Sequence, residues 1–245
     1  DTHPVLAIPE LMRLLLDEHG MGWEEAWEIV SNTFAYTNHT VLTEALEQWD
    51  QQIFQQLFWR VWEIIAEIDR RFRIERSAEG IDGVTIQRMA PIQHGVVHMA
   101  WIACYAAYSI NGVAALHTEI IKRETLGDWY ALWPEKFNNK TNGVTPRRWL
   151  RMINPRLSAL LTRLSGSDAW VTDLDKLKEL RSYASDESVM QELREIKAAN
   201  KHDFAEWIAE RQGVVIDPNS IFDVQIKRMH EYKRQLLNAL YVLDL

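Results

Sequence analysis

"EALEQWDQQIFQQLFWRVWEIIAEIDRRFRIER", residues 44–76, is the stretch that decides the fold class. Apolar residues recur along it every three or four positions, which places them on one face of an α-helix. Because this apolar seam is continuous, we predict a single helix of many turns over the stretch. The seam consists of Leu46, Trp49, Ile53, Leu57, Val61, Ile64 and Ile68.

Helical spacing also dominates the sequence before this stretch. The segment 3–20 ends at Gly20, and glycine is favoured just beyond the C-terminus of a helix. The segment 22–34 carries Glu24 and Glu25 in its first turn, where the helix dipole favours negative charge. Further along, residues 96–133 form a second apolar block, and two charged segments are predicted to be surface helices: residues 154–164 and 173–212.

The character of the sequence changes at "KFNNKTNGVTPRRW", residues 136–149. Asn, Gly, Thr and Pro crowd together there, and Pro146 is incompatible with a regular helix through it. We therefore predict two domains, residues 1–137 and residues 138–245. In the second, residues 222–226 alternate apolar and polar side chains and predict a strand, while residues 230–243 return to helical spacing.

Composition excludes several classes of protein. The chain is 47% hydrophobic and 25% charged, as ordinary globular proteins are, and its formal net charge of -8 argues against a nucleic-acid coat protein. No stretch approaches the roughly 18 uninterrupted apolar residues of a membrane-spanning helix, and no leader pattern opens the sequence. The single cysteine, Cys104, lies in an apolar run and fits a buried side chain in a reducing cytosol. We expect a soluble cytoplasmic protein without nucleic-acid or membrane partners.

A cluster of four cations stands out in this acidic chain, in "IKRMHEYKRQ", residues 226–235. Lys227 and Arg228 follow the predicted strand, and Lys233 and Arg234 lie within the predicted helix. A strand end that leads into a helix is a common phosphate-binding position in α/β proteins. Arginine offers a bidentate fork and lysine a compact charge, so the cluster could hold two phosphate groups. The alternative is a solvated basic surface.

Two polar islands are candidates for sugar binding. His39 lies in "AYTNHT", residues 35–40, where amide, hydroxyl and imidazole groups offer both donors and acceptors to sugar hydroxyls. "NNKTNG", residues 138–143, is similar in kind. The alternatives are a structural histidine and an ordinary turn. His94 and His98, four residues apart, could face one another on a helix, but nothing nearby completes a ligand set, so we predict no metal site.

Five longer strings carry a resemblance to a known family. The sequence is similar to the middle of glycogen, starch and maltodextrin phosphorylases over essentially all of its 245 residues. That resemblance implies a mainly α structure with few strands, an excised part of a two-domain glycosyltransferase-B-type (α/β) fold whose parallel sheets are mostly outside the chain. Residues 1–137 then resemble the end of the N-terminal domain, and residues 138–245 the start of the C-terminal domain that binds cofactor and phosphate. The strings are "DTHPVLAIPELMRLLLDE", "FAYTNHTVLTEALEQWD", "NGVAALHTEII", "KFNNKTNGVTPRRWL" and "IFDVQIKRMHEYKRQLLNAL".

The resemblance also implies an activity. Such enzymes split α-1,4-glucosidic bonds of glycogen or maltodextrin with inorganic phosphate to give glucose 1-phosphate, and pyridoxal phosphate is their cofactor. Its phosphate group relays a proton to the inorganic phosphate. The lysine that forms the Schiff base belongs to a segment beyond Leu245, so the resemblance implies that this chain lacks it. We therefore expect the isolated chain to be inactive.

Site residues follow from the matching motifs. The resemblance implies catalytic roles for His39 beside the glucosyl unit and for Arg228 and Lys233 at the substrate phosphate. Four residues are implied in or near substrate binding: Asn142, Tyr232, Asp1 and His3. Two are implied at the cofactor, Lys227 at its phosphate and Trp149 in the wall of its pocket.

The sequence is also compatible with a second class of function. The chain could be a non-enzymatic helical module derived from the enzyme that associates with itself, as a homo-oligomer, through exposed tryptophans. The sequence holds eleven tryptophans, most of which we assign to packing because they lie within helical patterns.

Overall fold

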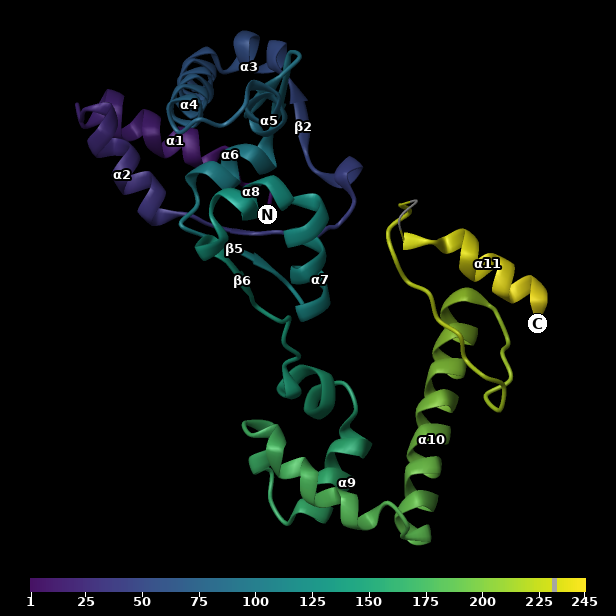
Figure 1. The fold of residues 1–245 in the computed structure, drawn as a ribbon. Coiled ribbons are helices and arrows are strands. Elements are labelled where there is room, and N and C mark those ends of the chain that lie inside the picture. The colour runs from purple at the N-terminus through teal and green to yellow at the C-terminus, as the bar shows by residue number, and fades with distance from the viewer. Residues whose placement is uncertain (231–232) are drawn as a thin grey trace. The chain divides into compact units, whose positions relative to one another are not determined.

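The computed structural model describes residues 1–230 and 233–245. It divides the chain into two compact units, Asp1–Gly143 and Val144–Leu245, which are described separately below. Helices dominate both units (Figure 1). The predicted fold class, mainly α with few strands, is confirmed. The assignment of residues 1–137 and 138–245 to two domains of a longer enzyme stays a prediction.

Short helices make up most of the first unit. Two of them, α1 and α7, continue into single π-helical turns at Leu14–Glu18 and Ile121–Thr125. The helices are α1 (Ala7–Arg13), α2 (Trp23–Thr33), α3 (Gln51–Leu57), α4 (Trp59–Ala78), α5 (Gly83–Met89), α6 (Met99–Ala106), α7 (Ala115–Ile120) and α8 (Gly127–Leu132).

The predicted single helix over residues 44–76 is wrong in its first half. The chain there forms a short strand, β2 (Gln48–Asp50), and then two helices that meet at Phe58, whose φ of -139° and ψ of 50° are not helical. The Asp50 side chain accepts a hydrogen bond from the Gln52 N–H at 2.8 Å, which starts α3 as a separate helix. From Trp59 onward the predicted periodicity holds: Ile64 and Ile68 of the predicted seam are buried on α4, together with Ile65 and Phe72.

Two small sheets lie among these helices. The strands β1 (Ala35–Thr37), β5 (Ser109–Gly112) and β6 (Phe137–Asn139) form a parallel sheet in the order β1-β5-β6, with Ile110 of β5 between Tyr36 and Phe137. The strands β2, β3 (Ile92–Gln93) and β4 (Val96–His98) form an antiparallel sheet in the order β2-β4-β3.

The β3–β4 connection corrects the prediction for His94 and His98. His94 and Gly95 have φ of 49° and 82°, the left-handed pair of a two-residue hairpin turn. His98 ends β4 and stacks on Trp101, with ring centroids 6.0 Å apart. The two imidazoles therefore lie on a hairpin and not on one face of a helix.

Aromatic rings fill the core of the first unit around Phe72, which is completely buried. The centroid of its ring lies 5.2 Å from that of Tyr105 and 5.4 Å from that of Trp129. Trp133 continues the cluster, 5.7 Å from Trp129, and carries the Lys136 ammonium 4.0 Å above its ring. Burial lowers the pKa of Lys136 to about 8. Trp129 and Trp133 therefore contribute packing, whereas Trp49 and Trp59, for which the sequence also predicts packing, are 42% and 63% exposed.

An ion-pair cluster on α4 should make the stability of the first unit depend on pH. Hydrogen bonds from Arg70, and then from Arg71, hold the pKa of Glu67 at about 2, against an ordinary value of 4.5. Because the folded-state pKa is depressed, the stabilisation is present above pH 4.5 and is lost as the pH falls toward 2. We expect Glu67→Gln to flatten the acid limb of the stability of this unit in urea titrations. Glu28→Gln, at an exposed position on α2, is the control and should leave that limb unchanged.

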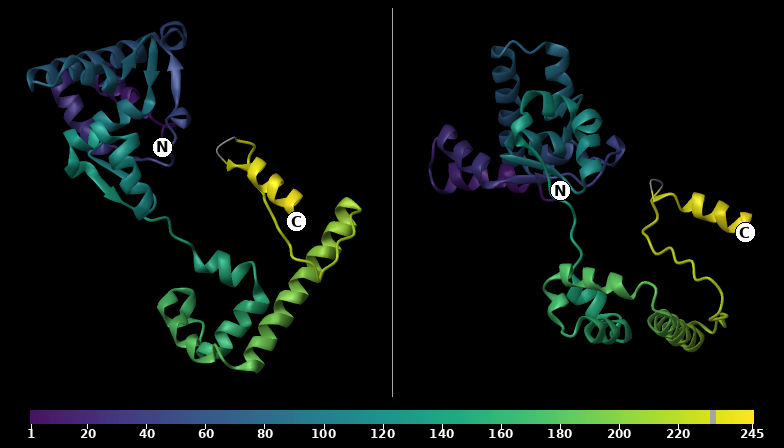
Figure 2. Two further views of the ribbon diagram at one scale, coloured as in Figure 1. Left: turned by 45° about the vertical axis from the view of Figure 1, so that its right-hand side comes forward. Right: turned by 60° about the horizontal axis from the view of Figure 1, so that its bottom comes forward.

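The described residues of the second unit form α-helices and shorter turns. The α9 helix (Pro155–Ser165) starts at Asn154, whose side chain accepts the Leu157 N–H, and ends at Gly166 with a φ of 71°. The α10 helix (Glu187–Gln212) starts at Asp186 and ends at Gly213, where the sequence predicted its end. Figure 2 shows α10 as one uninterrupted helix. The remaining elements are a π-helical turn Arg147–Met152, 3₁₀ turns Ala169–Val171 and Leu174–Tyr183, and α11 (Gln235–Asp244).

The strand predicted over residues 222–226 is wrong, because the chain between residues 214 and 230 is irregular. A strand needs a neighbour to complete its backbone hydrogen bonds, and the described residues of this unit contain none. The helix predicted from residue 230 begins later, at Gln235, since Arg234 has a φ of 57° that interrupts helical geometry. Within the described residues, no helix combines the length and hydropathy needed to cross a bilayer.

Candidate functional site

The carboxyl edge of the parallel sheet gathers polar residues in the first unit. Backbone hydrogen bonds continue the ladder past each strand end, from the Asn38 N–H to the Asn111 C=O at 2.9 Å and from the Lys140 N–H to the Gly112 C=O at 3.0 Å. In open parallel sheets this edge is where ligands bind. The predicted site residues His39 and Asn142 follow β1 and β6, so the fold brings both to the same edge.

His39 is exposed on a loop that its neighbours hold in place. Asn38 is only 1% exposed, and its amide donates to the Tyr36 hydroxyl at 3.2 Å while its side-chain oxygen accepts the Thr40 N–H at 3.0 Å. Burial raises the pKa of Tyr36, so the phenol stays protonated in this contact. The imidazole of His39 is therefore presented to solvent from a fixed turn.

Asn142 is also exposed, and its position is fixed through the backbone. Its N–H donates to the Val113 C=O at 2.9 Å, which ties the segment after β6 to the turn after β5. Upstream, the Asn139 amide donates to the Thr141 hydroxyl at 2.9 Å. The segment 138–143 is thus an extension of a sheet edge and not an isolated turn.

Asp1 and His3 lie in a different contact network. The Asp1 carboxylate accepts the Thr2 N–H at 2.7 Å, and His3 Nδ1 lies 2.9 Å from a carboxylate oxygen of Glu47. Asp1 also lines an apolar cavity of about 110 Å³ beside β1. Within the described residues, neither side chain is hydrogen-bonded to His39 or Asn142.

The other predicted site residues belong to the second unit. Trp149 lies on the turn Arg147–Met152 and is 54% exposed, and Lys227 and Arg228 are exposed on the irregular segment. The Arg228 C=O accepts a hydrogen bond from the side-chain amide of Gln235 at 2.8 Å. The backbone N–H of Lys233 donates to the His230 C=O at 3.0 Å. Tyr232 lies outside the described residues.

Trp149 and Lys227 offer two kinds of contact that pyridoxal phosphate could use. An indole face and an ammonium are suitable partners for an aromatic ring and a phosphate group, respectively. Both side chains are open to solvent, so by themselves they do not enclose a bound group. The chemistry of these two side chains fits the ring and the phosphate group of such a cofactor.

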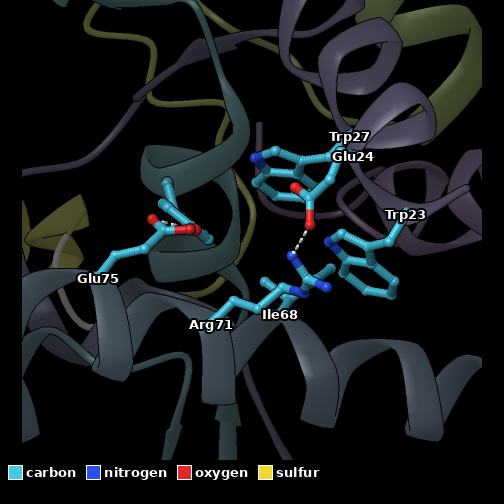
Figure 3. A pocket seen from close by; sticks show the side chains of 7 residues that line it. Trp23, Glu24, Trp27, Ile68, Arg71 and Glu75 are labelled. Atoms are coloured by element: carbon cyan, nitrogen blue, oxygen red, sulfur yellow. Dashed lines mark hydrogen bonds and ion pairs between the residues drawn. The ribbon is translucent and has the colours of Figure 1, made fainter.

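A separate small pocket lies between α2 and α4, and Arg71 is one of the side chains that line it (Figure 3). Arg71 is paired with Glu24 at 2.5 Å and lies over the ring of Trp23, 4.8 Å from its centroid. The remaining space, about 10 Å³, is that of a single water molecule. This pocket is an ion-pair and stacking contact that joins two helices.

Sequence reasoning missed several polar residues that build the sheet edge. The Thr37 hydroxyl donates to the Asn111 side chain at 2.9 Å, which links β1 to β5, and Thr118 is 2% exposed against the end of β6. Asn111 and Thr118 lie in "NGVAALHTEII", which the sequence analysis used only for its resemblance. Strands of three or four residues are too short to show an alternating pattern, so the edge itself was not predictable.

Comparison with known proteins assigns the class. A family model described as carbohydrate phosphorylase matches residues 1–245, and the chain belongs to this family of glycosyltransferases. It is 50% identical over 249 residues to "Alpha-glucan phosphorylase 2, cytosolic" of Arabidopsis thaliana, covering 99% of this chain and 29% of that protein.

Two further relatives come from distant organisms. Glycogen phosphorylase of Bacillus subtilis is 48% identical over 246 residues, covering 100% of this chain and 31% of that protein. The muscle form of glycogen phosphorylase from Bos taurus is 46% identical over 250 residues, covering 100% of this chain and 30% of that protein. The chain thus spans about 30% of the length of these relatives.

Proposed function

We propose that the full-length protein containing this chain is an α-glucan phosphorylase of the cytoplasm. It transfers the terminal glucosyl group of an α-1,4-glucan such as glycogen or maltodextrin to inorganic phosphate. The bond between glucosyl C1 and the glycosidic oxygen breaks, a C1–O bond to phosphate forms, and a proton is delivered to the departing 4-oxygen. The observation that carries this proposal is the shared sheet edge of His39 and Asn142 in a chain of the phosphorylase family.

In this proposal, residues at the sheet edge bind the glucosyl unit, and cations of the segment 226–235 bind the phosphate. His39 and Asn142 bind the glucosyl unit through hydrogen bonds to its hydroxyls, with Tyr232, Asp1 and His3 as further substrate contacts. Hydroxyl groups both donate and accept, which matches the imidazole and amide groups at this edge.

Arg228 and Lys233 bind the inorganic phosphate in this proposal. Positive charge fixed in place beside a phosphate lowers the energy of a transition state in which negative charge develops on it. The guanidinium of Arg228 offers two parallel N–H donors, and the ammonium of Lys233 adds a compact charge.

We further propose pyridoxal phosphate as the cofactor of the full-length protein, with Lys227 at its phosphate and Trp149 against its ring. When bound, the cofactor supplies a phosphate group that relays a proton. The lysine for its Schiff base is proposed to lie outside this chain. Without that lysine the isolated chain would hold the cofactor only loosely. Because correct orientation of reacting groups can lower a barrier by about 7–11 kcal/mol, the isolated chain is proposed to be inactive.

The test compares the 245-residue chain with the full-length protein. Each is incubated with pyridoxal phosphate, dialysed and examined by absorbance, and each is assayed for phosphate-dependent release of glucose 1-phosphate from maltodextrin. We expect the full-length protein to retain the cofactor and release product, and the isolated chain to do neither. A full-length protein that retains cofactor but releases no glucose 1-phosphate would contradict the proposed reaction.

Exposed apolar side chains support a second candidate for the isolated chain, a self-associating helical module. Trp59 is 63% exposed at the start of α4, and Leu236 and Leu237 of α11 are 74% and 60% exposed. Association would remove such surface from water. Light scattering at increasing concentration separates this candidate from a monomer.

A further inference from the structure

A chain of two hydrogen bonds connects a helix of the first unit to the predicted sugar-binding residue. The Val113 N–H donates to Nδ1 of His117 on α7 at 3.0 Å. The C=O of the same residue, Val113, accepts the Asn142 N–H at 2.9 Å. We propose that His117 is a positioning residue, which fixes the turn after β5 and through it the backbone that carries Asn142. The inference rests on the proposed function only for the role of Asn142 as a sugar-binding residue.

The contact defines the protonation of the His117 ring. Nδ1 accepts a hydrogen bond from a backbone N–H, so it carries a lone pair and the proton of the neutral ring lies on Nε2. Nε2 is buried and has no hydrogen-bond partner among the described residues. A protonated ring would present a donor to another donor at Val113, so only the neutral ring with its proton on Nε2 holds this turn.

A second contact from α7 reaches the other side of the same edge. The Thr118 hydroxyl lies 2.8 Å from the side-chain oxygen of Asn139, at the end of β6, and 2.9 Å from the Ala114 C=O. His117 and Thr118 are adjacent in sequence, so one turn of α7 contacts the chain after β5 and the end of β6. Asn142 is three residues beyond this second contact.

Gly112 shows how closely α7 lies against the end of β5. A Cβ atom built there would lie 2.5 Å from the Thr118 hydroxyl oxygen and 2.9 Å from the Thr118 Cα. Real Cβ atoms do not approach backbone this closely, so only glycine permits the contact. This close packing places the turn of α7 that carries His117 directly against the end of β5, within hydrogen-bond distance of Val113.

The test uses three variants of the chain and its amide spectrum. His117→Leu removes the acceptor at similar volume, and His117→Asn returns an acceptor oxygen close to the position of Nδ1. Leu116→Ala changes the preceding residue, which is 74% exposed, and serves as the control. The readouts are amide hydrogen exchange at Val113 and Asn142 and the ¹⁵N resonances of the His117 ring.

We expect His117→Leu to speed exchange at both amides by about fivefold, the effect of losing one hydrogen bond. His117→Asn should restore slow exchange, and Leu116→Ala should leave it unchanged. The ring resonances should show a proton on Nε2 alone. Unchanged exchange at Val113 in His117→Leu, or a proton on Nδ1 in the wild-type spectrum, would overturn the proposal.

A kinetic measurement separates this proposal from the proposed function. In the full-length protein, His117→Leu should raise KM for maltodextrin more than it lowers kcat, and His117→Asn should reverse most of the change. If exchange responds as expected but Asn142→Ala leaves maltodextrin kinetics unaltered, the positioning contact holds and the sugar-binding role of Asn142 fails. If exchange does not respond, the positioning role itself is wrong.

Discussion

Phe72→Ala is expected to lower the free energy of unfolding of the first unit by about 3–5 kcal/mol. The Phe72 ring is completely buried and touches Tyr105 and Trp129, and the Arg76 guanidinium lies 5.9 Å from its centre. Truncation removes these contacts and leaves a cavity that the surrounding rings cannot fill without leaving their rotamers. A domain is stable by only about 5–15 kcal/mol in total, so the substitution should remove a large share of the stability of this unit.

Ile74→Ala provides the matched control, since it lies two residues further along α4 and is 54% exposed. It should change stability by less than about 0.5 kcal/mol. Because the chain divides into two compact units, the measurement is amide exchange in urea at residues of the first unit. A loss below about 1 kcal/mol in Phe72→Ala would show that this ring is not central to the core.

Arg228→Ala is expected to reduce phosphorolysis by the full-length protein about 10²–10³-fold, the usual effect of removing one fixed donor to a developing charge. Arg228→Lys keeps the charge but loses the bidentate fork, so its activity should lie between those of alanine and wild type. The measurement is the initial rate of glucose 1-phosphate release at increasing phosphate concentration.

Arg234→Asn tests whether any cation of the same cluster would serve. Arg234 has a φ of 57°, and asparagine tolerates this left-handed geometry better than alanine, so the substitution removes charge with little strain. We expect its rate to stay within about threefold of wild type, since loss of an exposed charge has small effects. Equal losses in both variants would mean that general positive charge, and not Arg228 itself, binds phosphate.

Helix positions were largely predictable because their signals are local. Gly213 ends α10 as expected, and the buried seam of α4 keeps its predicted spacing. The break at Phe58 was not predictable from periodicity, because the apolar pattern continues across it while the backbone does not. The strand predicted at residues 222–226 is wrong although apolar and polar side chains do alternate there. A strand requires hydrogen-bonded neighbours, and a local sequence pattern does not supply them.

Individual residues of the candidate site could be predicted from the sequence, but their arrangement at the sheet edge could not. Resemblance pointed to His39 and Asn142, and the parallel order β1-β5-β6 explains why residues so far apart in sequence reach one edge. Asn38 and His117 carried no signal, since a buried asparagine and a histidine that accepts a backbone hydrogen bond are recognised only from their surroundings. The roles of all these residues, in both units, in binding substrate and cofactor stay predictions.

The position of Cys104 has a practical consequence. The thiol is completely buried and burial raises its pKa, so almost none of it is present as the reactive thiolate while the first unit is folded. Alkylating reagents and peroxide can then reach the sulfur only during transient openings of the surrounding core. Since the chain has one cysteine, the rate at which it is labelled records those openings directly.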